Sequence, residues 1–263
     1  MTSFTTLELQ IDGAVARIWL NRPEMRNAID DVFIRELGEA FAQAEAAPGV
    51  RAVVLGGRGP AFCAGANLHW MKRAAEFTPE QNLQDAAGLP RMLRTLYASR
   101  LPVIARVQGD VYAGGMGLVS VCDVAIAAEG ANFCLSEVKI GLIPATISPY
   151  VIRAMGARAA QRYFLTGERF SAAEAHRIGF VHEVVPADAL DAKVDEVLKN
   201  IAAAAPGAVS ECKRLLRDVT GERIDDALSD ETVRRIAQLR ASEEGQEGLR
   251  SFLEKRKPRW VSR

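Results

Sequence analysis

The sequence predicts an α/β fold that ends in a largely helical region. Two observations support this prediction. From the N-terminus to about Ala157, short apolar runs typical of strands alternate with segments whose apolar residues recur at helical spacing. After Ala157 the strand-like runs nearly disappear. A chain of 263 residues suits one large domain or a domain with an appendage. We expect an α/β core at residues 1–200 and a helical C-terminal region at residues 201–263.

Each predicted element follows from a local pattern. Apolar or alternating runs predict strands at residues 7–11, 15–20, 50–55, 102–107, 124–127, 133–135 and 180–185. Asp12-Gly13 between the first two strands is a hairpin turn signal. Helical spacing predicts helices at residues 29–46, 116–122, 159–165, 172–178, 189–204, 207–219, 224–242 and 243–256. Residues 68–100 predict two further helices with a joint near residues 76–81, where Pro79 interrupts the pattern.

Composition excludes several classes of protein. Lys plus Arg and Asp plus Glu both number 33, and this balance argues against a general nucleic-acid or membrane-surface role. The four cysteines lack the spacing of a metal site. The N-terminus shows no secretory signal pattern, and no apolar run approaches the length of a membrane span. We therefore expect a cytoplasmic protein without a metal and without a membrane or nucleic-acid partner.

Two segments rich in Gly and Ala predict a catalytic site. Each follows a strand-like run: Ala61-Phe62-Cys63-Ala64-Gly65-Ala66-Asn67 in one case and Ala113-Gly114-Gly115-Met116-Gly117 in the other. Such segments leave main-chain N–H groups uncovered by side chains, and two of these groups that converge on one point would form an oxyanion hole. Glu137, a carboxylate among apolar neighbours, could transfer protons there. We expect burial to raise its pKa.

Taken in order, these segments resemble the crotonase family, the enoyl-CoA hydratases and isomerases. The matching pieces span nearly the whole chain: Leu20-Asn21-Arg22-Pro23, Asn27-Ala28, residues 61–66, 111–117, Cys122-Asp123, 133–143, 165–167, 172–175, 179–181 and 252–257. Any one piece is weak, whereas the ordered set is specific. The resemblance implies a spiral of ββα units followed by a helical C-terminal region that assembles trimers, which often stack into hexamers.

The resemblance also implies an acyl-CoA thioester as the ligand, with no cofactor beyond the substrate's own coenzyme A. By position in the family motifs, the N–H groups of Ala66 and Gly114 would bind the thioester oxygen, and Glu137 would be the catalytic carboxylate. A β-carbon at Gly114 would crowd that thioester. The positions that match the coenzyme A path are Arg26, Ala28, Ala64, Leu68, His69 and, at the end of the chain, Lys255.

The sequence departs from the family pattern at two positions that bear on the chemistry. Hydratases of the family use a second glutamate, and its position is Gly117 here. Asn67 stands where many members have Asp. Residues 133–138 and 141–150 nevertheless resemble a bacterial branch assigned to methylglutaconyl-CoA and related branched substrates, in which Gly is common at the position of Gly117. A glutaconyl substrate needs a cation for its distal carboxylate, and Lys72, Arg73 and Arg94 are the candidates.

Three functions therefore remain open. A hydratase would add water to a 2-enoyl-CoA, with Glu137 taking the proton of water and passing it to C2. An isomerase would shift a double bond from Δ3 to Δ2, which needs only one carboxylate. An acyl-CoA-binding protein that has lost its chemistry is the non-enzyme alternative. We favour the hydratase, as a homotrimer or hexamer.

Overall fold

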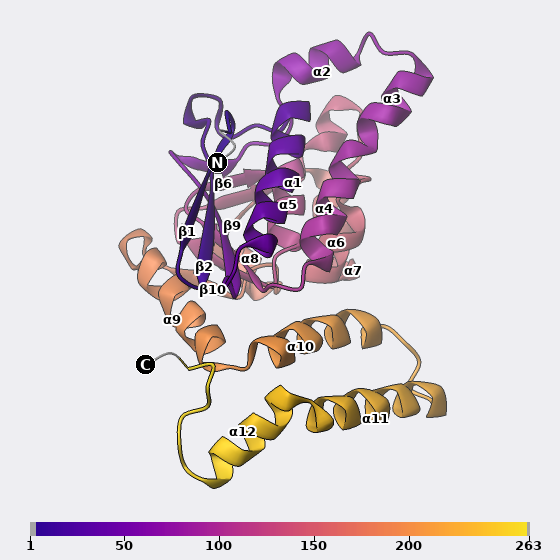
Figure 1. Cartoon of the computed structure of the whole chain (residues 1–263). Helices are drawn as coiled ribbons and strands as arrows, with labels where there is room; N and C mark the ends of the chain where they lie inside the picture. The colour runs from indigo at the N-terminus through magenta and orange to yellow at the C-terminus, as the bar shows by residue number, and fades with distance from the viewer. Residues whose placement is uncertain (1–3, 262–263) are drawn as a thin grey trace.

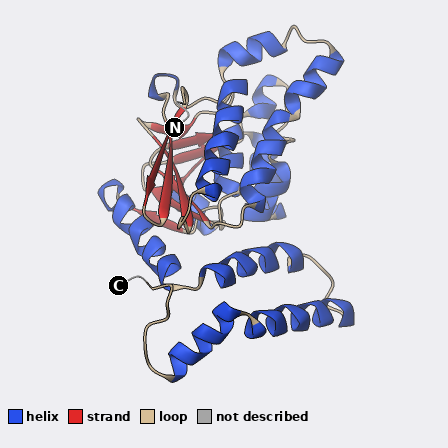
Figure 2. Ribbon diagram, viewed as in Figure 1, coloured by secondary structure: helices blue, strands red, loops and turns tan. Residues whose placement is uncertain are grey.

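The computed structural model describes residues 4–261 and confirms the α/β class. Its strands form two sheets (Figure 2). The larger sheet contains, in spatial order, β1 (Leu7–Asp12), β2 (Val15–Leu20), β3 (Ala52–Gly57), β5 (Val103–Val107), β7 (Val124–Ala128) and β10 (Glu183–Val185). The smaller sheet contains β4 (Ala61–Cys63), β6 (Asp110–Tyr112), β8 (Asn132–Cys134) and β9 (Arg169–Ser171). Only the β1–β2 and β8–β9 pairs are antiparallel.

The chain winds as a repeated strand–strand–helix unit. The first strand of each unit joins the larger sheet and the second joins the smaller one, as β3 and β4, then β5 and β6, then β7 and β8. A helical segment follows each pair. Strands β4, β6 and β8 are parallel neighbours, so the loops that follow them leave the smaller sheet on one side. The first Gly- and Ala-rich segment contains β4 and the loop after it, and the second runs from the end of β6 into α5.

Helices cover the larger sheet on both faces. On one face lie α1 (Asp31–Ala46), α4 (Gly88–Ala98), α5 (Gly114–Ser120), α6 (Ser148–Met155), α7 (Ala157–Thr166) and α8 (Ala172–Arg177) (Figure 1). On the other face α9 (Leu190–Ala203) packs Leu190, Val194 and Leu198 against alternate strand residues such as Val54 and Ile104. This alternation agrees with the two-residue period of strands buried on both faces.

A pair of helices and a group of three helices extend from this body at opposite ends (Figure 1). At one end α2 (Leu68–Ala74) and α3 (Pro79–Ala86) project beyond the sheet. At the other end α10 (Pro206–Val219), α11 (Asp226–Ala241) and α12 (Glu243–Leu253) form a separate group, which we call the C-terminal arm. None of the helices in the described residues is long and apolar enough to cross a membrane. Short 3-10 helices complete the chain: η1 (Pro23–Met25), η2 (Glu137–Ile140) and η3 (Ala187–Ala189).

Several predicted elements differ from those observed. Residues 68–100 form three helices rather than two, because a second break occurs at Ala87 in addition to the break before Thr78. The strand expected at residues 180–185 is limited to its last three residues. The helix expected from residue 29 begins at Asp31, because Ile29 pairs with Ala66 and Asp30 caps the helix. Strands β4, β6 and β9 and helix α6 were not predicted.

Candidate active site

A cavity of about 390 Å³ brings the three predicted catalytic residues together. Glu137, Ala66 and Gly114 all line it. The other lining residues come mainly from α2 and the segment from η2 to the start of α6, and most are apolar: Ile29, Ala64, Leu68, Trp70, Met71, Leu89, Ala113, Ser136, Ile140, Leu142, Ile143, Pro144, Thr146 and Ile147. An apolar cavity with a few polar groups is the usual form of a small-molecule site.

Ala66 is held by a parallel bridge to the segment before α1. The Ile29 N–H donates to the Gly65 carbonyl at 2.7 Å, and the Asn67 N–H donates to the Ile29 carbonyl at 2.7 Å. In such a bridge the N–H of the middle residue points away from its partner strand. No main-chain carbonyl in the described residues accepts a hydrogen bond from the Ala66 N–H. This N–H is therefore free for a ligand.

Gly114 is the first residue of α5, where helical N–H groups have no partner within the helix. The residue before it, Ala113, has φ 48° and ψ −118°, a conformation that only glycine adopts without strain. Its N–H donates to the Cys134 carbonyl at 2.9 Å. A Cβ on Gly114 would lie 2.8 Å from Ile29 Cδ1. This atom is the flexible end of the Ile29 side chain, so a small shift of Ile29 would make room for a Cβ. The expectation that a bound thioester favours glycine at this position stays a prediction.

The two loops that carry these N–H groups touch each other. A Cβ on Gly65 would lie 2.9 Å from the Ala113 Cβ and 3.2 Å from the Tyr112 carbonyl oxygen. Gly65 also has φ +91°, which favours glycine. Gly65 precedes Ala66, and Ala113 precedes Gly114. Because the residues before Ala66 and Gly114 are in contact, the main chains of Ala66 and Gly114 lie at the same end of the cavity.

Glu137 is the carboxylate of this cavity. It begins η2, and its Oε2 atom is buried without a hydrogen-bond partner in the described residues. Burial raises the pKa of Glu137, and only its own main-chain N–H opposes this effect. The direction agrees with the sequence prediction. A carboxylate whose pKa moves toward neutral pH is a better proton donor and a usable base.

The position of the second family carboxylate is closed by an apolar side chain. A Cβ on Gly117 would lie 2.4 Å from Ile147 Cγ2 and 3.4 Å from Leu93 Cδ1. Ile147 is only 1% exposed, so it has little room to move. A glutamate at residue 117 would need α6 or α5 to shift. Among the lining residues the remaining polar side chains are Ser136, Thr146 and Trp70.

Of the six residues expected along the coenzyme A path, only some lie at this cavity. Ala64 and Leu68 line the cavity, and the Ala64 N–H donates to the Arg26 carbonyl at 3.0 Å, so Arg26 is adjacent. Ala28 is buried, and His69 is exposed beside the cavity with its N–H bound to Asn67 Oδ1 at 2.8 Å. Lys255 follows α12 in the C-terminal arm and is not a lining residue. A single chain therefore does not bring Lys255 to this cavity.

None of the cations considered for a distal carboxylate lines the cavity. Arg73 is paired with Asp31 at 2.8 Å. Lys72 and Arg94 are exposed on α2 and α4, respectively. The described residues also contain no cluster of three or more His, Cys, Asp or Glu that could hold a metal ion.

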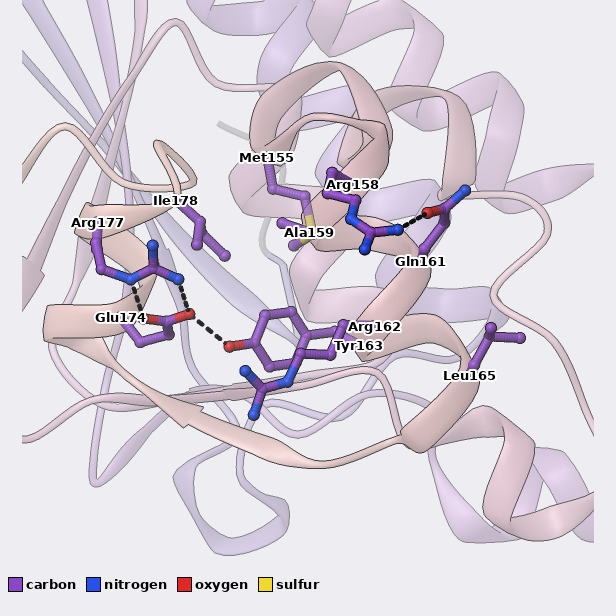
Figure 3. A pocket seen from close by; sticks show the side chains of 10 residues that line it. All are labelled: Met155, Arg158, Ala159, Gln161, Arg162, Tyr163, Leu165, Glu174, Arg177 and Ile178. Carbon is purple, nitrogen blue, oxygen red and sulfur yellow. Dashed lines mark hydrogen bonds and ion pairs between the residues drawn. The ribbon is translucent and has the colours of Figure 1, made fainter.

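A larger hollow, of about 770 Å³, lies elsewhere, between α7 and α8 (Figure 3). Its charged groups already have partners: Glu174 accepts bonds from Arg177 at 2.6 and 2.7 Å and from the Tyr163 hydroxyl at 2.7 Å. These bonds hold the pKa of Glu174 down, at about 2. A carboxylate that stays ionised and fully bonded is a poor proton carrier, so we place the active site in the smaller cavity.

Comparison with known proteins agrees with this geometry. The family model for enoyl-CoA hydratase/isomerase matches residues 10–263. The chain belongs to the enoyl-CoA hydratase/isomerase family. The crystal structure of an enoyl-CoA hydratase from Shewanella pealeana is 42% identical, with a TM-score of 0.95 over 98% of this chain and 96% of the other. A protein from Thermus thermophilus is 37% identical over 253 residues, 94% of this chain and 98% of its own. A mevalonyl-coenzyme A hydratase from Aspergillus fumigatus is 35% identical over 248 residues, 92% and 89% of the two chains.

Membership of the enoyl-CoA hydratase/isomerase family confirms the resemblance seen in the sequence and the crotonase fold. The sequence did not identify Ile29 and Ile147 as parts of the site. Ile29 lies 37 residues before Ala66 in the bridge, and Ile147 lies 30 residues after Gly117. Each acts through a contact between distant segments, and no local spacing signals such a contact.

Proposed function

We propose that this protein is an enoyl-CoA hydratase, which adds water to the double bond of a 2-enoyl-CoA thioester. The observation that carries the proposal is the shared cavity of Glu137, Ala66 and Gly114. The N–H groups of Ala66 and Gly114 would bind the thioester oxygen as it gains negative charge. Each such donor contributes about 2.7–4 kcal/mol in a transition state of this kind.

Glu137 would carry the proton in both halves of the reaction. Its carboxylate takes a proton from water as the water oxygen bonds to C3, and the electron pair of the double bond moves to C2 and the thioester oxygen. Glu137 then returns the proton to C2 on the same face. The unpartnered Oε2 atom and the raised pKa of Glu137 support this role.

One observation favours a second candidate, a Δ3-Δ2 enoyl-CoA isomerase. Ile147 closes the site of a second carboxylate beside Gly117. An isomerase needs only one group to remove a proton from C2 and return it to C4, and Glu137 suffices for this. A positioned acid or base contributes about 10²–10⁴-fold in rate, so its loss slows hydration without abolishing it. The names of several relatives, including the enoyl-CoA hydratase of Shewanella pealeana, lead us to prefer hydration.

The test is turnover of a panel of thioesters by the wild type and by Glu137→Gln. Hydration of 2-enoyl-CoA is followed by the loss of the conjugated ultraviolet band, and isomerisation of 3-enoyl-CoA by its gain. A branched 2-enoyl and a glutaconyl thioester show which acyl chain is preferred. We expect hydration by the wild type and a loss of about 10²–10⁴-fold in kcat for Glu137→Gln.

The matched control is Glu129→Gln, an exposed glutamate outside the cavity. It should keep wild-type rates. A Glu137→Gln variant within a fewfold of the wild type would contradict the assigned role of Glu137. Binding of acyl-CoA without turnover of any thioester would support the non-enzyme alternative instead.

A further inference from the structure

Asn67 follows the proposed donor Ala66 and stands where many family members have Asp. Its main chain completes the bridge that holds Ala66, since its N–H donates to the Ile29 carbonyl. Its side chain is also engaged, and the residue is only 8% exposed. The loop around Ala66 is therefore fixed by Asn67 through both main chain and side chain.

The Asn67 amide uses its two ends for different partners. Its Oδ1 accepts the N–H of His69 at 2.8 Å and of Trp70 at 3.4 Å, and so caps α2. Its Nδ2 donates to Asp30 Oδ2 at 3.2 Å. An aspartate could cap the helix equally well, but it has no hydrogen to donate to another carboxylate.

Asp30 is a fixed and ionised partner. Its Oδ1 accepts the Phe33 N–H at 2.9 Å and caps α1, while its Oδ2 accepts Arg22 Nη1 at 2.7 Å. Burial alone would raise the pKa of Asp30, but the bonds from Arg22, Phe33 and Asn67 outweigh it and lower the pKa. The Asp30–Asn67 bond thus ties the N-terminal caps of α1 and α2 together, and Ala66 lies directly before one of these caps.

We propose that Asn67 is a positioning residue for the oxyanion hole, acting through its bond to Asp30 to set the place of the Ala66 N–H relative to Gly114. This inference rests on the proposed function of the same cavity. Catalysis of this type depends on donors that are already in place, and a displacement of about 1 Å can cost on the order of 10²-fold in rate.

The decisive variant is Asn67→Asp, which keeps the size of the side chain and the oxygen that caps α2. It loses the donor to Asp30 and places two carboxylates where the structure has a hydrogen bond of 3.2 Å. We expect kcat to fall about 10–10²-fold with little change in KM, because substrate contacts remain and only the transition-state contact is displaced. The enolate band of a bound 3-ketoacyl-CoA should weaken in parallel, since the same N–H groups stabilise that enolate.

Rescue distinguishes positioning from general damage to the fold. In Asp30→Asn/Asn67→Asp, the amide of residue 30 can donate to the carboxylate of residue 67 while its oxygen still accepts the Phe33 N–H, but Arg22 Nη1 loses its acceptor at residue 30. The kcat of the double variant should therefore rise above that of Asn67→Asp without reaching the wild-type value. The matched control is Asp225→Asn at the cap of α11, where Asp225 Oδ1 accepts the Leu228 N–H at 3.0 Å. This cap lies in the C-terminal arm, and its exchange should leave kcat unchanged.

The outcomes separate the two proposals. A wild type that hydrates no 2-enoyl-CoA overturns the proposed function. A wild type that hydrates normally, with an Asn67→Asp variant that matches it in kcat and in the enolate band, overturns the positioning role alone. A loss of kcat that Asp30→Asn fails to rescue also overturns it, because the effect would then not pass through Asp30.

Discussion

Glu137 combines burial with the absence of a hydrogen-bond partner, and this has a consequence for stability. Its Oε2 atom is buried and unpartnered, and the pKa of Glu137 is raised in the folded protein. Between the ordinary glutamate pKa of about 4.3 and the raised value, the folded state binds more protons than the unfolded state. The contribution of Glu137 to the free energy of unfolding therefore falls as the pH rises from about 4.3 to the raised pKa.

We predict that Glu137→Gln is more stable than the wild type at neutral pH. Glutamine removes the cost of the buried charge, so the gain should shrink as pH falls toward about 4, where the wild-type glutamate is protonated in both states. Urea midpoints of the two proteins from pH 4 to pH 8 measure this difference. Glu129→Gln should show no such trend, and an equal gain at all pH values for Glu137→Gln would contradict the argument.

Single residues show where sequence-based prediction stops. The two Gly- and Ala-rich segments and the isolated carboxylate of Glu137 are visible locally, whereas Ala66 and Gly114 follow within those segments only from the resemblance to the family motifs. All three residues line one cavity. The positive φ of Ala113 was not predicted, because an alanine gives no sign that its backbone will adopt a conformation suited to glycine. That strain is imposed by the contacts around it, including the close approach of Gly65.

At the scale of helices and strands, the number of residues in an element largely determines whether the sequence predicts it. The hairpin β1–β2, strands β3, β5 and β7, and helices α1 and α7–α12 extend over enough residues for a period to be recognised. Strands β4, β6 and β9 have three residues each, too few for any alternation. They exist because the spiral brings them side by side. Strands β8 and β10 are equally short, and only the apolar runs at residues 133–135 and 180–185 made them predictable. Helix α6 was missed because Pro149 reads as a break, although proline is well placed in the first turn of a helix.

An ion pair between the buried Lys213 and the partly exposed Asp123 attaches the C-terminal arm to the core. Lys213 of α10 donates to Asp123 Oδ2 at 2.7 Å and to the Leu101 carbonyl at 2.9 Å, and its side chain is 8% exposed. The Val103 N–H also donates to Asp123 Oδ2 at 2.7 Å. Asp123 thus joins the start of β5, the loop before β7 and α10.

We predict that Lys213→Met destabilises the protein by about 2–3 kcal/mol, because the Asp123 carboxylate and the Leu101 carbonyl lose their charged partner. Asp123 is partly exposed, and this keeps the effect below that of a fully buried pair. Urea unfolding at one fixed protein concentration measures the change. Lys199→Met, at an exposed lysine of α9, is the control and should cost less than about 0.5 kcal/mol.

At the scale of the whole molecule, the C-terminal arm buries too little to be explained by one chain. Within the described residues, α11 has no buried side chain in its 16 residues, and α10 has only Lys213. Large apolar side chains of the arm are instead exposed: Leu216, Ile224, Val233, Ile236, Leu249, Phe252 and Leu253. Helices of this length gain most of their stability from packing of an apolar face. Exposed apolar residues gathered in this way are typical of a surface that contacts another protein.

We predict that the protein self-associates through this arm, as a trimer or a hexamer of the 28.5-kDa chain. Phe252 and Leu253 are 81% and 77% exposed at the end of α12, and a charge there would be costly to bury in an interface. Phe252→Asp should therefore lower the mass measured by light scattering during gel filtration. Leu83→Asp on α3, where Leu83 is 76% exposed, is the control and should keep the wild-type mass. A monomeric wild type would contradict the prediction, because the apolar residues of the arm would then face water in the functional protein.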